Sequence, residues 1–313
     1  MDERELPPQA VESPAGARGG AAARPRDPMP SRQAHECAAC GRGDVVASGE
    51  NGRDEFSSPY VYALGRVEPR LPSLGVEKEF AQVIGQADTA DLTDREALHA
   101  VLAEPRNRYL ARHLCYVFTV RELETYVVRP HESGDLPLLV EALRAAPRST
   151  DLHALIGVRG PLAPPDLCNG LMIPVVTFDQ IYSFDAGSLV RSLPKPDGVA
   201  EEPFRSAAEE LFERVMHLAD NAGSSDEHRA LNYLVVRYPS VYAKTAEAFA
   251  EGASLTAIET RPSRLSGRMR TILDVIFSYT GRTTDVTEKF FVRVDVTEEF
   301  PFLVTKLSPY YDR

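Results

Sequence analysis

Long hydrophobic runs and a secretion signal are both missing from this chain of 313 residues. No stretch reaches the roughly 18 consecutive apolar residues that a membrane-spanning helix needs. The N-terminus, MDERELPPQ, is acidic, whereas a secretory signal begins with positive charge and continues into an apolar centre. We therefore expect a cytoplasmic protein with no membrane partner.

Positive charge is also scarce. Lys and Arg number 35 against 46 Asp and Glu, which gives a formal net charge of -11. Because contacts to phosphate dominate nucleic-acid affinity, this balance excludes nucleic acid as the expected partner. Hydrophobic residues make up 43% and charged residues 26%, which is ordinary globular usage, so most of the chain should fold.

Only four cysteines are present, too few for a disulfide scaffold. Cys37 and Cys40 form a C-x-x-C pair, which is typical of half a tetrahedral zinc site. We predict a structural Zn2+ held by Cys37, Cys40, Cys115 and Cys168, because the loop-rich segment around the pair needs a staple. The alternatives are a redox pair, His35 as a substitute ligand, and lone cysteines that act only as small buried side chains.

Signatures of catalysis are absent as well. The motifs G-x-S-x-G, H-E-x-x-H, the P-loop, G-x-G-x-x-G and the kinase set do not occur. Asp179 and Asp185 are candidates for a pair of catalytic carboxylates, although flanking aromatic residues favour a strand end where they cap turns. The histidines are scattered singly, and we expect structural roles for them. An enzyme is therefore the less favoured interpretation.

Composition divides the chain into three segments. Residues 1–30 contain six Pro, three Gly and six Ala, so we expect a disordered tail that is dispensable for folding. Residues 31–58 are a loop-rich segment around the C-x-x-C pair, which we expect to resemble a zinc knuckle. Residues 59–313 are predicted to form a single compact α+β domain, with a mixed or antiparallel sheet and a helical hairpin.

Periodicity places the elements of that domain. Helices are predicted from apolar spacing near 76–83, 136–146 and 204–220, and from capping boxes at 93–96 and 224–227. Strands are predicted near 60–64, 114–120, 125–128, 152–158, 171–184, 255–259, 272–279 and 290–297. No regular strand–helix–strand alternation appears.

Four arginines lie within ten residues of this acidic chain: Arg261, Arg264, Arg268 and Arg270. Pro262, Ser263, Ser266 and Gly267 mark the segment as a loop. Guanidinium groups suit carboxylates, so we predict that this loop binds an acidic peptide. The alternative is pairing with surplus acids of the same chain.

Several runs together carry a family resemblance. They are YALGRVEPR (62–70), GVEKEF (75–80), LETY (123–126), CNGL (168–171), FDQIYSF (178–184), NYL (232–234), RPSRL (261–265), EKFFVRVDVTEEFP (288–301) and LSPYYD (307–312). From about residue 36 to the end, the chain resembles the C-terminal domain of the cyanobactin maturation proteases PatA and PatG. None of its Asp, His or Ser residues falls in a subtilisin-type motif, so the protease activity does not transfer.

The resemblance implies a place in the biosynthesis of a ribosomally synthesised, post-translationally modified peptide (RiPP), through a domain with no assigned activity. We expect an accessory protein that binds the precursor peptide or a partner tailoring enzyme. One alternative is an unrecognised enzyme that modifies the precursor, for which Asp179, Asp185, Glu124 and His228 are the residues to test. The other is a zinc-stabilised scaffold subunit. No oligomeric state is predicted.

Overall fold

The computed structural model describes residues 59–86, 91–218 and 220–311. The predicted tail (1–30) and the C-x-x-C segment (31–58) lie outside the described residues, so both remain predictions. Among the described residues, no helix is both long and apolar enough to cross a membrane.

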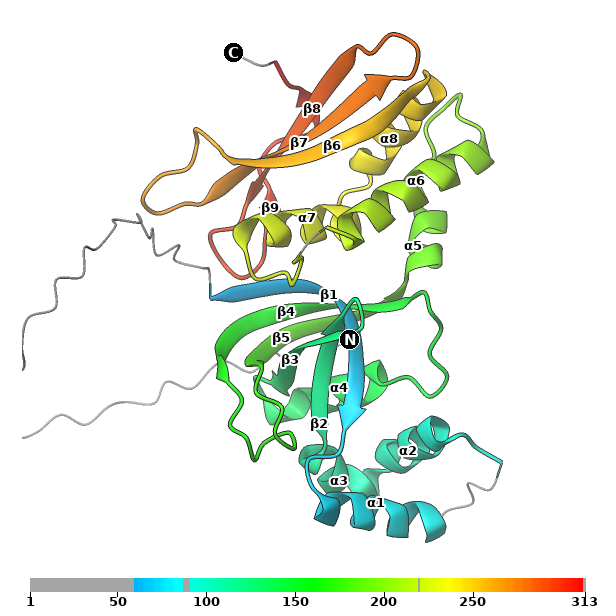
Figure 1. The fold of residues 1–313 in the computed structure, drawn as a ribbon, viewed down its shortest axis with the longest axis vertical. Coiled ribbons are helices and arrows are strands. Elements are labelled where there is room, and N and C mark those ends of the chain that lie inside the picture. Colours follow the sequence, from blue (N-terminus) through cyan, green and yellow to red (C-terminus); the bar gives the residue numbers. More distant parts are fainter. Residues whose placement is uncertain (1–58, 87–90, 219, 312–313) are drawn as a thin grey trace, which may run out of the picture. The chain divides into compact units, whose positions relative to one another are not determined.

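Five strands close into a barrel (Figure 1): β1 (Tyr60–Arg70), β2 (Cys115–Val120), β3 (Leu123–Pro130), β4 (Asp151–Leu162) and β5 (Pro174–Asp185). Their order around the barrel is β1-β2-β3-β5-β4. β3 and β5 run parallel, and the other neighbours are antiparallel. The long β1 pairs with β4 through residues 60–65 and with β2 through 66–70. This order, with one strand shared between two halves, is the topology of the OB-fold.

Helices cover one end of the barrel. Between β1 and β2 lie α1 (Leu74–Gln86), α2 (Asp94–Ala103), the short 3-10 helix η1 (Pro105–Asn107) and α3 (Arg108–His113). Between β3 and β4 lie η2 (Ser133–Asp135) and α4 (Leu136–Ala142). Apolar side chains of these helices share one core with the barrel interior, including Leu110, Leu139 and Phe178. The capping box predicted at Thr93 and Glu96 is present at the start of α2.

A second sheet occupies the C-terminal part. It consists of β6 (Ala253–Pro262), β7 (Ile272–Gly281), β8 (Thr287–Asp295) and β10 (Ser308–Pro309) in the order β10-β8-β7-β6, with β9 (Phe302–Leu303) also pairing with β8. The helices α5 (Ala186–Ser192), α6 (Glu201–Met216), α7 (Asp226–Arg237) and α8 (Ser240–Ala250) connect β5 to β6. In Figure 1, α6, α7 and α8 lie between this sheet and the barrel.

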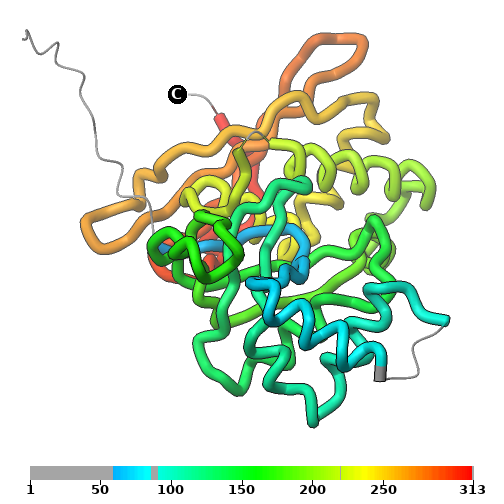
Figure 2. Tube along the Cα trace, turned by 60° about the horizontal axis from the view of Figure 1, so that its bottom comes forward, coloured from blue at the N-terminus to red at the C-terminus, as the bar shows by residue number. Residues whose placement is uncertain are grey.

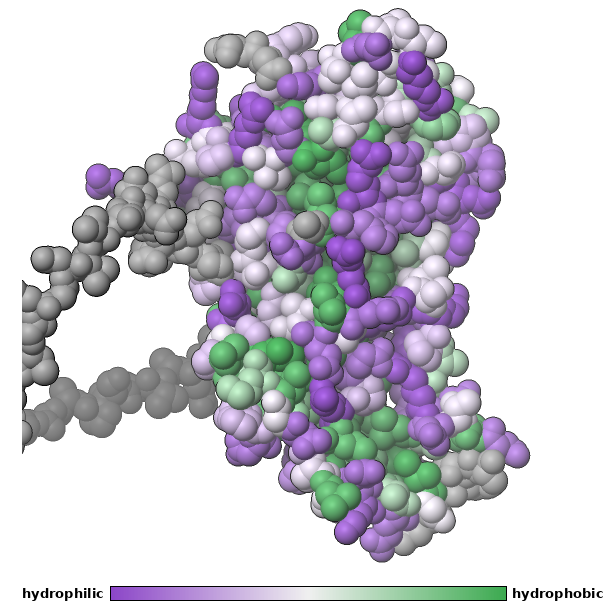
Figure 3. Space-filling view, in the orientation of Figure 1, coloured by the Kyte–Doolittle hydropathy of each residue, from purple (hydrophilic) through white to green (hydrophobic). Residues whose placement is uncertain are grey.

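One hydrophobic core joins the three layers. It contains Tyr62 and Ile156 from the barrel, Leu211 and Leu234 from the helices, and Val292 from the second sheet. Figure 3 shows hydrophobic side chains reaching the surface among hydrophilic ones at the lower end of this face, where α1–α3 lie.

The loop before α7 is tied directly to β1. The Tyr62 amide donates to the Gly223 carbonyl at 2.8 Å, and the Asn232 side-chain amide donates to the Tyr62 carbonyl at 2.8 Å. Gly223 has a φ of 71°, and a Cβ there would collide with the Tyr62 carbonyl. Only glycine fits both the left-handed backbone and the close approach.

The α+β class is as predicted, but the sheet arrangement differs. A single mixed or antiparallel sheet was expected, whereas the described residues form a barrel and a second sheet. The predicted hairpin of α6 and α7 is present. The N-cap of α7 is Ser225, one residue later than predicted, and its side chain accepts a hydrogen bond from the His228 amide. Periodicity also missed α8.

Candidate functional site

The arginine loop connects β6 to β7 as a projecting hairpin, which both Figure 1 and Figure 2 show at the left. Serines build its interior. The Ser263 amide donates to the Ile272 carbonyl at 2.8 Å, and the Ser266 hydroxyl bonds both the carbonyl and the amide of Ile272 at 2.6 and 2.9 Å. Because serines satisfy the backbone inside the turn, the arginine side chains are left at the surface.

Arg270 is committed to the fold. Its guanidinium bonds the carboxylate of Asp295 at 2.6 and 2.8 Å, and Asp295 is only 2% exposed. Burial alone would raise the pKa of Asp295, but hydrogen bonds from Thr297 and Arg270 outweigh burial and hold that pKa below its usual range. For this residue, the alternative of pairing within the chain is the observed one.

The other three arginines are differently placed. Arg261 pairs with Glu259 at 2.7 Å and reaches the Tyr310 hydroxyl at 3.4 Å. Arg264 and Arg268 are exposed and form no ion pair with any described residue. The predicted cluster therefore splits into one structural arginine, one paired arginine at the surface and two that present their charge to solvent.

Arg261 and Arg264 border a pocket of about 550 Å³ on the outer face of the second sheet. Its lining also includes Arg293 and Phe291 from β8, Asp274 from β7, and Pro309, Tyr310 and Tyr311 from the C-terminal segment. We call this set of eight residues the arginine–aromatic pocket. Since Phe291 and Arg293 alternate with the buried Val292 and Val294, the period-two pattern of β8 places both on the outer face.

The floor of the pocket is rigidly held. Arg293 donates to Asp274 at 2.9 Å and to the Ser263 hydroxyl at 3.2 Å, and its guanidinium lies 4.8 Å from the centre of the Phe291 ring. The Phe291 and Tyr310 rings meet edge to face, with centroids 5.6 Å apart. Arg293 neutralises Asp274, and Glu259 pairs with Arg261. Arg264 therefore adds an unneutralised positive charge to a pocket that also contains aromatic rings. Such an arrangement binds carboxylates together with apolar side chains.

Only two of the four predicted zinc ligands lie among the described residues. Cys37 and Cys40 lie outside the described residues. Cys115 and Cys168 are brought together from a sequence separation of 53, with 5.7 Å between their Cα atoms, and are joined by a disulfide. Two cysteines this close fit either the disulfide or, when reduced, half of a tetrahedral thiolate site. The described residues contain no cluster of three or more metal-ligating side chains. The zinc site stays a prediction.

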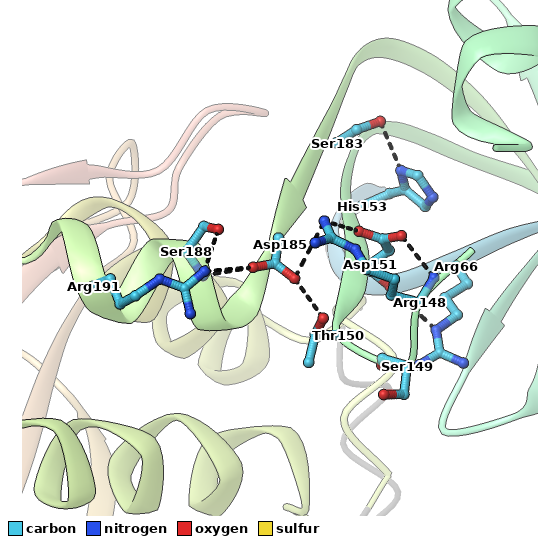
Figure 4. Close-up of polar contacts among 10 residues, drawn as sticks. All are labelled: Arg66, Arg148, Ser149, Thr150, Asp151, His153, Ser183, Asp185, Ser188 and Arg191. Carbon is cyan, nitrogen blue, oxygen red and sulfur yellow. Dashed lines mark hydrogen bonds and ion pairs between the residues drawn. The ribbon is translucent and has the colours of Figure 1, made fainter. Parts of the chain in front are cut away.

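Asp185 acts as the N-cap of α5 (Figure 4). Its carboxylate accepts hydrogen bonds from the Thr150 hydroxyl and from the Ser188 amide at 2.7 Å, while Arg148 and Arg191 lie 3.6 and 3.4 Å away. These hydrogen bonds, that from Thr150 foremost, hold the pKa of Asp185 well below its usual range. Asp185 is therefore an ionised helix cap, and its carboxylate oxygens already accept hydrogen bonds from neighbouring residues.

His153, one of the histidines for which a structural role was expected, lies next to this network (Figure 4). His153 is 3% exposed, and its Nδ1 meets the Ser183 hydroxyl at 2.9 Å. Burial first, and then the positive charge of Arg144, lower the pKa of His153 to about 4, so its ring is neutral at pH 7. Nearby Asp151 is held by the amide of Arg148 at 2.8 Å. This network supports the end of the β4–β5 hairpin.

Asp179 does not pair with Asp185, because the six steps along the strand from one to the other correspond to about 20 Å. Its carboxylate instead contacts His131 Nδ1 at 2.9 Å and lies beside Glu299. Burial first, and then the hydrogen bond and charge of Asp179, raise the pKa of Glu299 to about 7. No sequence signal links these residues, since Glu299 follows Asp179 by more than a hundred positions.

The two remaining candidates have ordinary structural contacts. Glu124 forms an exposed ion pair with Arg70. The His228 amide donates to the Ser225 hydroxyl at 3.2 Å in the first turn of α7, and burial lowers the pKa of its imidazole. Neither residue is brought to the arginine–aromatic pocket.

The C-terminal part of the chain is similar to a known family. Residues 198–310 match the family model described as PatG C-terminal. This segment, about a third of the chain, is similar to the PatG C-terminal family. This matched segment contains α6–α8, the second sheet and most of the arginine–aromatic pocket. No curated protein sequence matches the chain.

The fold of the chain is similar to a solved structure, "PatG Domain of Unknown Function". The TM-score is 0.65 at 21% sequence identity, and the likeness covers 82% of this chain and 99% of that one. At this identity the likeness establishes the fold.

Proposed function

We propose that the chain is an accessory protein of RiPP biosynthesis that binds the precursor peptide through the arginine–aromatic pocket. The PatG C-terminal match and the PatG-like fold support the pathway. The binding role is carried by one observation: Arg261 and Arg264 border a pocket of about 550 Å³ floored by Phe291 and Tyr310.

The pocket determines what kind of segment it accepts. Arg264 forms no ion pair with a described residue, so its guanidinium is available for a carboxylate. The rings beside it offer apolar contact to a neighbouring side chain. A segment that carries Asp or Glu next to an apolar or aromatic residue therefore fits, and attraction to it should weaken as salt screens the charges.

The test uses the purified full chain and the precursor peptide encoded in its gene neighbourhood, labelled with fluorescein. Arg264→Ala should weaken binding several-fold in fluorescence anisotropy, because a charge-assisted contact contributes about 1 kcal/mol. Arg268→Ala is the matched control, since Arg268 is exposed on the same loop but does not line the pocket. Equal affinity of both variants and the wild type would remove the pocket from the site.

The enzyme alternative retains one supporting observation. Glu299, with a pKa raised to about 7 beside Asp179 and His131, is poised to hold or release a proton near neutral pH, a property shared with catalytic carboxyls. Mass spectrometry of the same incubation decides between the two proposals. A change in peptide mass that Glu299→Gln abolishes supports the enzyme, and an unchanged mass together with binding supports the accessory role.

A further inference from the structure

A second concave surface lies on the barrel, outside the segment matched by the PatG C-terminal model. A hollow of about 490 Å³ lies between α3 and α4, and another of about 420 Å³ lies against the start of β2 and the end of β3. Both are lined by Arg112, Ser133 and Leu136, so they form one continuous depression. We call it the barrel groove.

The charge of the barrel groove is opposite to that of the chain. Its lining includes Arg108, Arg112 and Arg129, and Glu141 is the one acidic residue among all its lining residues. The three arginines are exposed, and within the described part of the chain they form no ion pair. In a chain of net charge -11, unneutralised arginines gathered in a depression favour an anionic occupant.

Aliphatic side chains border both parts of the groove. Leu102, Leu136 and Val140 border the part between α3 and α4, and Val127 and Leu167 border the part against the strands. Tyr116 is the one Phe, Tyr or Trp residue of the lining, but it is 4% exposed and its hydroxyl donates to the Ala111 carbonyl. The exposed rings of the lining are the imidazoles of His113 and His131, and no exposed Phe, Tyr or Trp ring is among the lining residues. The net charge of -11 disfavours a nucleic-acid occupant.

Topology gives the groove a second, independent argument. In OB-fold barrels, ligands bind across β2 and β3, between the β1–β2 and β4–β5 connections. Here the groove is bordered by β2 and β3, by Arg112 and His113 from the β1–β2 connection, and by Leu167 from the β4–β5 connection. The Cys115–Cys168 disulfide ties the β4–β5 connection to β2, so that this wall is held in place.

We propose that the barrel groove is a second binding site, and that its occupant is an acidic peptide segment with aliphatic side chains. Carboxylates of the segment pair with Arg112 and Arg129, and its aliphatic side chains fill the hollow between α3 and α4. This site is separate from the arginine–aromatic pocket and does not depend on it.

The test measures anisotropy of the full-length protein with a fluorescein-labelled synthetic peptide, three repeats of Glu-Leu-Leu-Glu. A second peptide carries Gln at every Glu position, and an oligo-dT of the same length is the nucleic-acid probe. The variant R112E/R129E alters the groove. R159E/R268E is the matched control, because it changes the charge equally with two exposed arginines that line neither the barrel groove nor the arginine–aromatic pocket.

Saturable binding of the acidic peptide is expected, weakened about tenfold in R112E/R129E and within about twofold of wild type in R159E/R268E. The Gln peptide should bind at least about tenfold more weakly, and thermal melts of the variants should match wild type. Three results overturn the proposal: no saturable binding of the acidic peptide, equal binding of the Gln peptide, or tighter binding of oligo-dT. A fourth result would also overturn it: loss of binding in R264E but not in R112E/R129E would assign the peptide to the arginine–aromatic pocket.

Discussion

Replacing the loop arginines one at a time should separate folding from binding. Arg270→Ala removes the cation from Asp295, whose side chain is 2% exposed, while Arg264→Ala and Arg268→Ala remove charges with no ion pair among the described residues. Stability should therefore fall in the first variant and hold in the other two.

The magnitude follows from burial. Breaking a fully buried ion pair costs about 3–5 kcal/mol, because one charge is left uncompensated. The Arg270 side chain is 54% exposed, and Asp295 keeps hydrogen bonds from the Thr297 amide and hydroxyl. We therefore expect Arg270→Ala to lower the free energy of unfolding by about 1–2 kcal/mol, and the two exposed substitutions to change it by less than about 0.5 kcal/mol.

Urea denaturation at pH 7 measures these differences through the midpoint, with an unchanged slope as the check. The pKa of Asp295 is lowered in the folded state, so its contribution is present above its unfolded pKa and is lost as pH falls through the folded value. The deficit of Arg270→Ala should therefore shrink in acid. In the Asp295→Asn background, the same substitution should cost less than about 0.5 kcal/mol. Equal stabilities of all three arginine variants would refute the reasoning.

Two further predictions concern titrating groups. The folded-state pKa of Glu299 is raised from 4.5 to about 7, so the free energy of unfolding should decline as pH rises through that window. Glu299→Gln should flatten this decline in urea denaturation between pH 5 and pH 8. Parallel pH profiles of the variant and the wild type would contradict the prediction. The second prediction concerns the zinc site expected at Cys37, Cys40, Cys115 and Cys168. Elemental analysis after mild reducing purification should find one zinc per chain, and Cys37→Ser should lower the zinc content. Full retention of zinc in that variant would reject the ligand set.

Local signals in the sequence predicted local structure well. The Thr93–Glu96 capping box starts α2, and the alternation of β8 correctly places Val292 and Val294 in the core. Both signals depend on residues a few positions apart, whose geometry a helix or strand fixes by itself. The α+β class followed from such elements.

Contacts between residues far apart in the sequence could not be predicted from such local signals. Closure of the barrel rests on the parallel pairing of β3 with β5 and on the two partners of β1, none of which periodicity reveals. The role of Arg270 depends on Asp295, 25 positions away. The arginine loop was predicted as a binding site, but Tyr310 joins it only because β10 pairs with β8.

The tie between Gly223, Asn232 and Tyr62 bears on where this molecule can be cut. The boundary of the PatG C-terminal match, at residue 198, leaves β1 and β4 on the other side. Yet those two strands share a core with Leu211 of α6 and Leu234 of α7. The strands contribute Tyr62, Leu64, Ala154 and Ile156 to it. A fragment that starts at residue 198 would expose this apolar helix face and leave the Asn232 amide without the Tyr62 carbonyl. The family boundary therefore marks where sequence similarity begins, while the unit of cooperative folding reaches back to the first strand of the barrel.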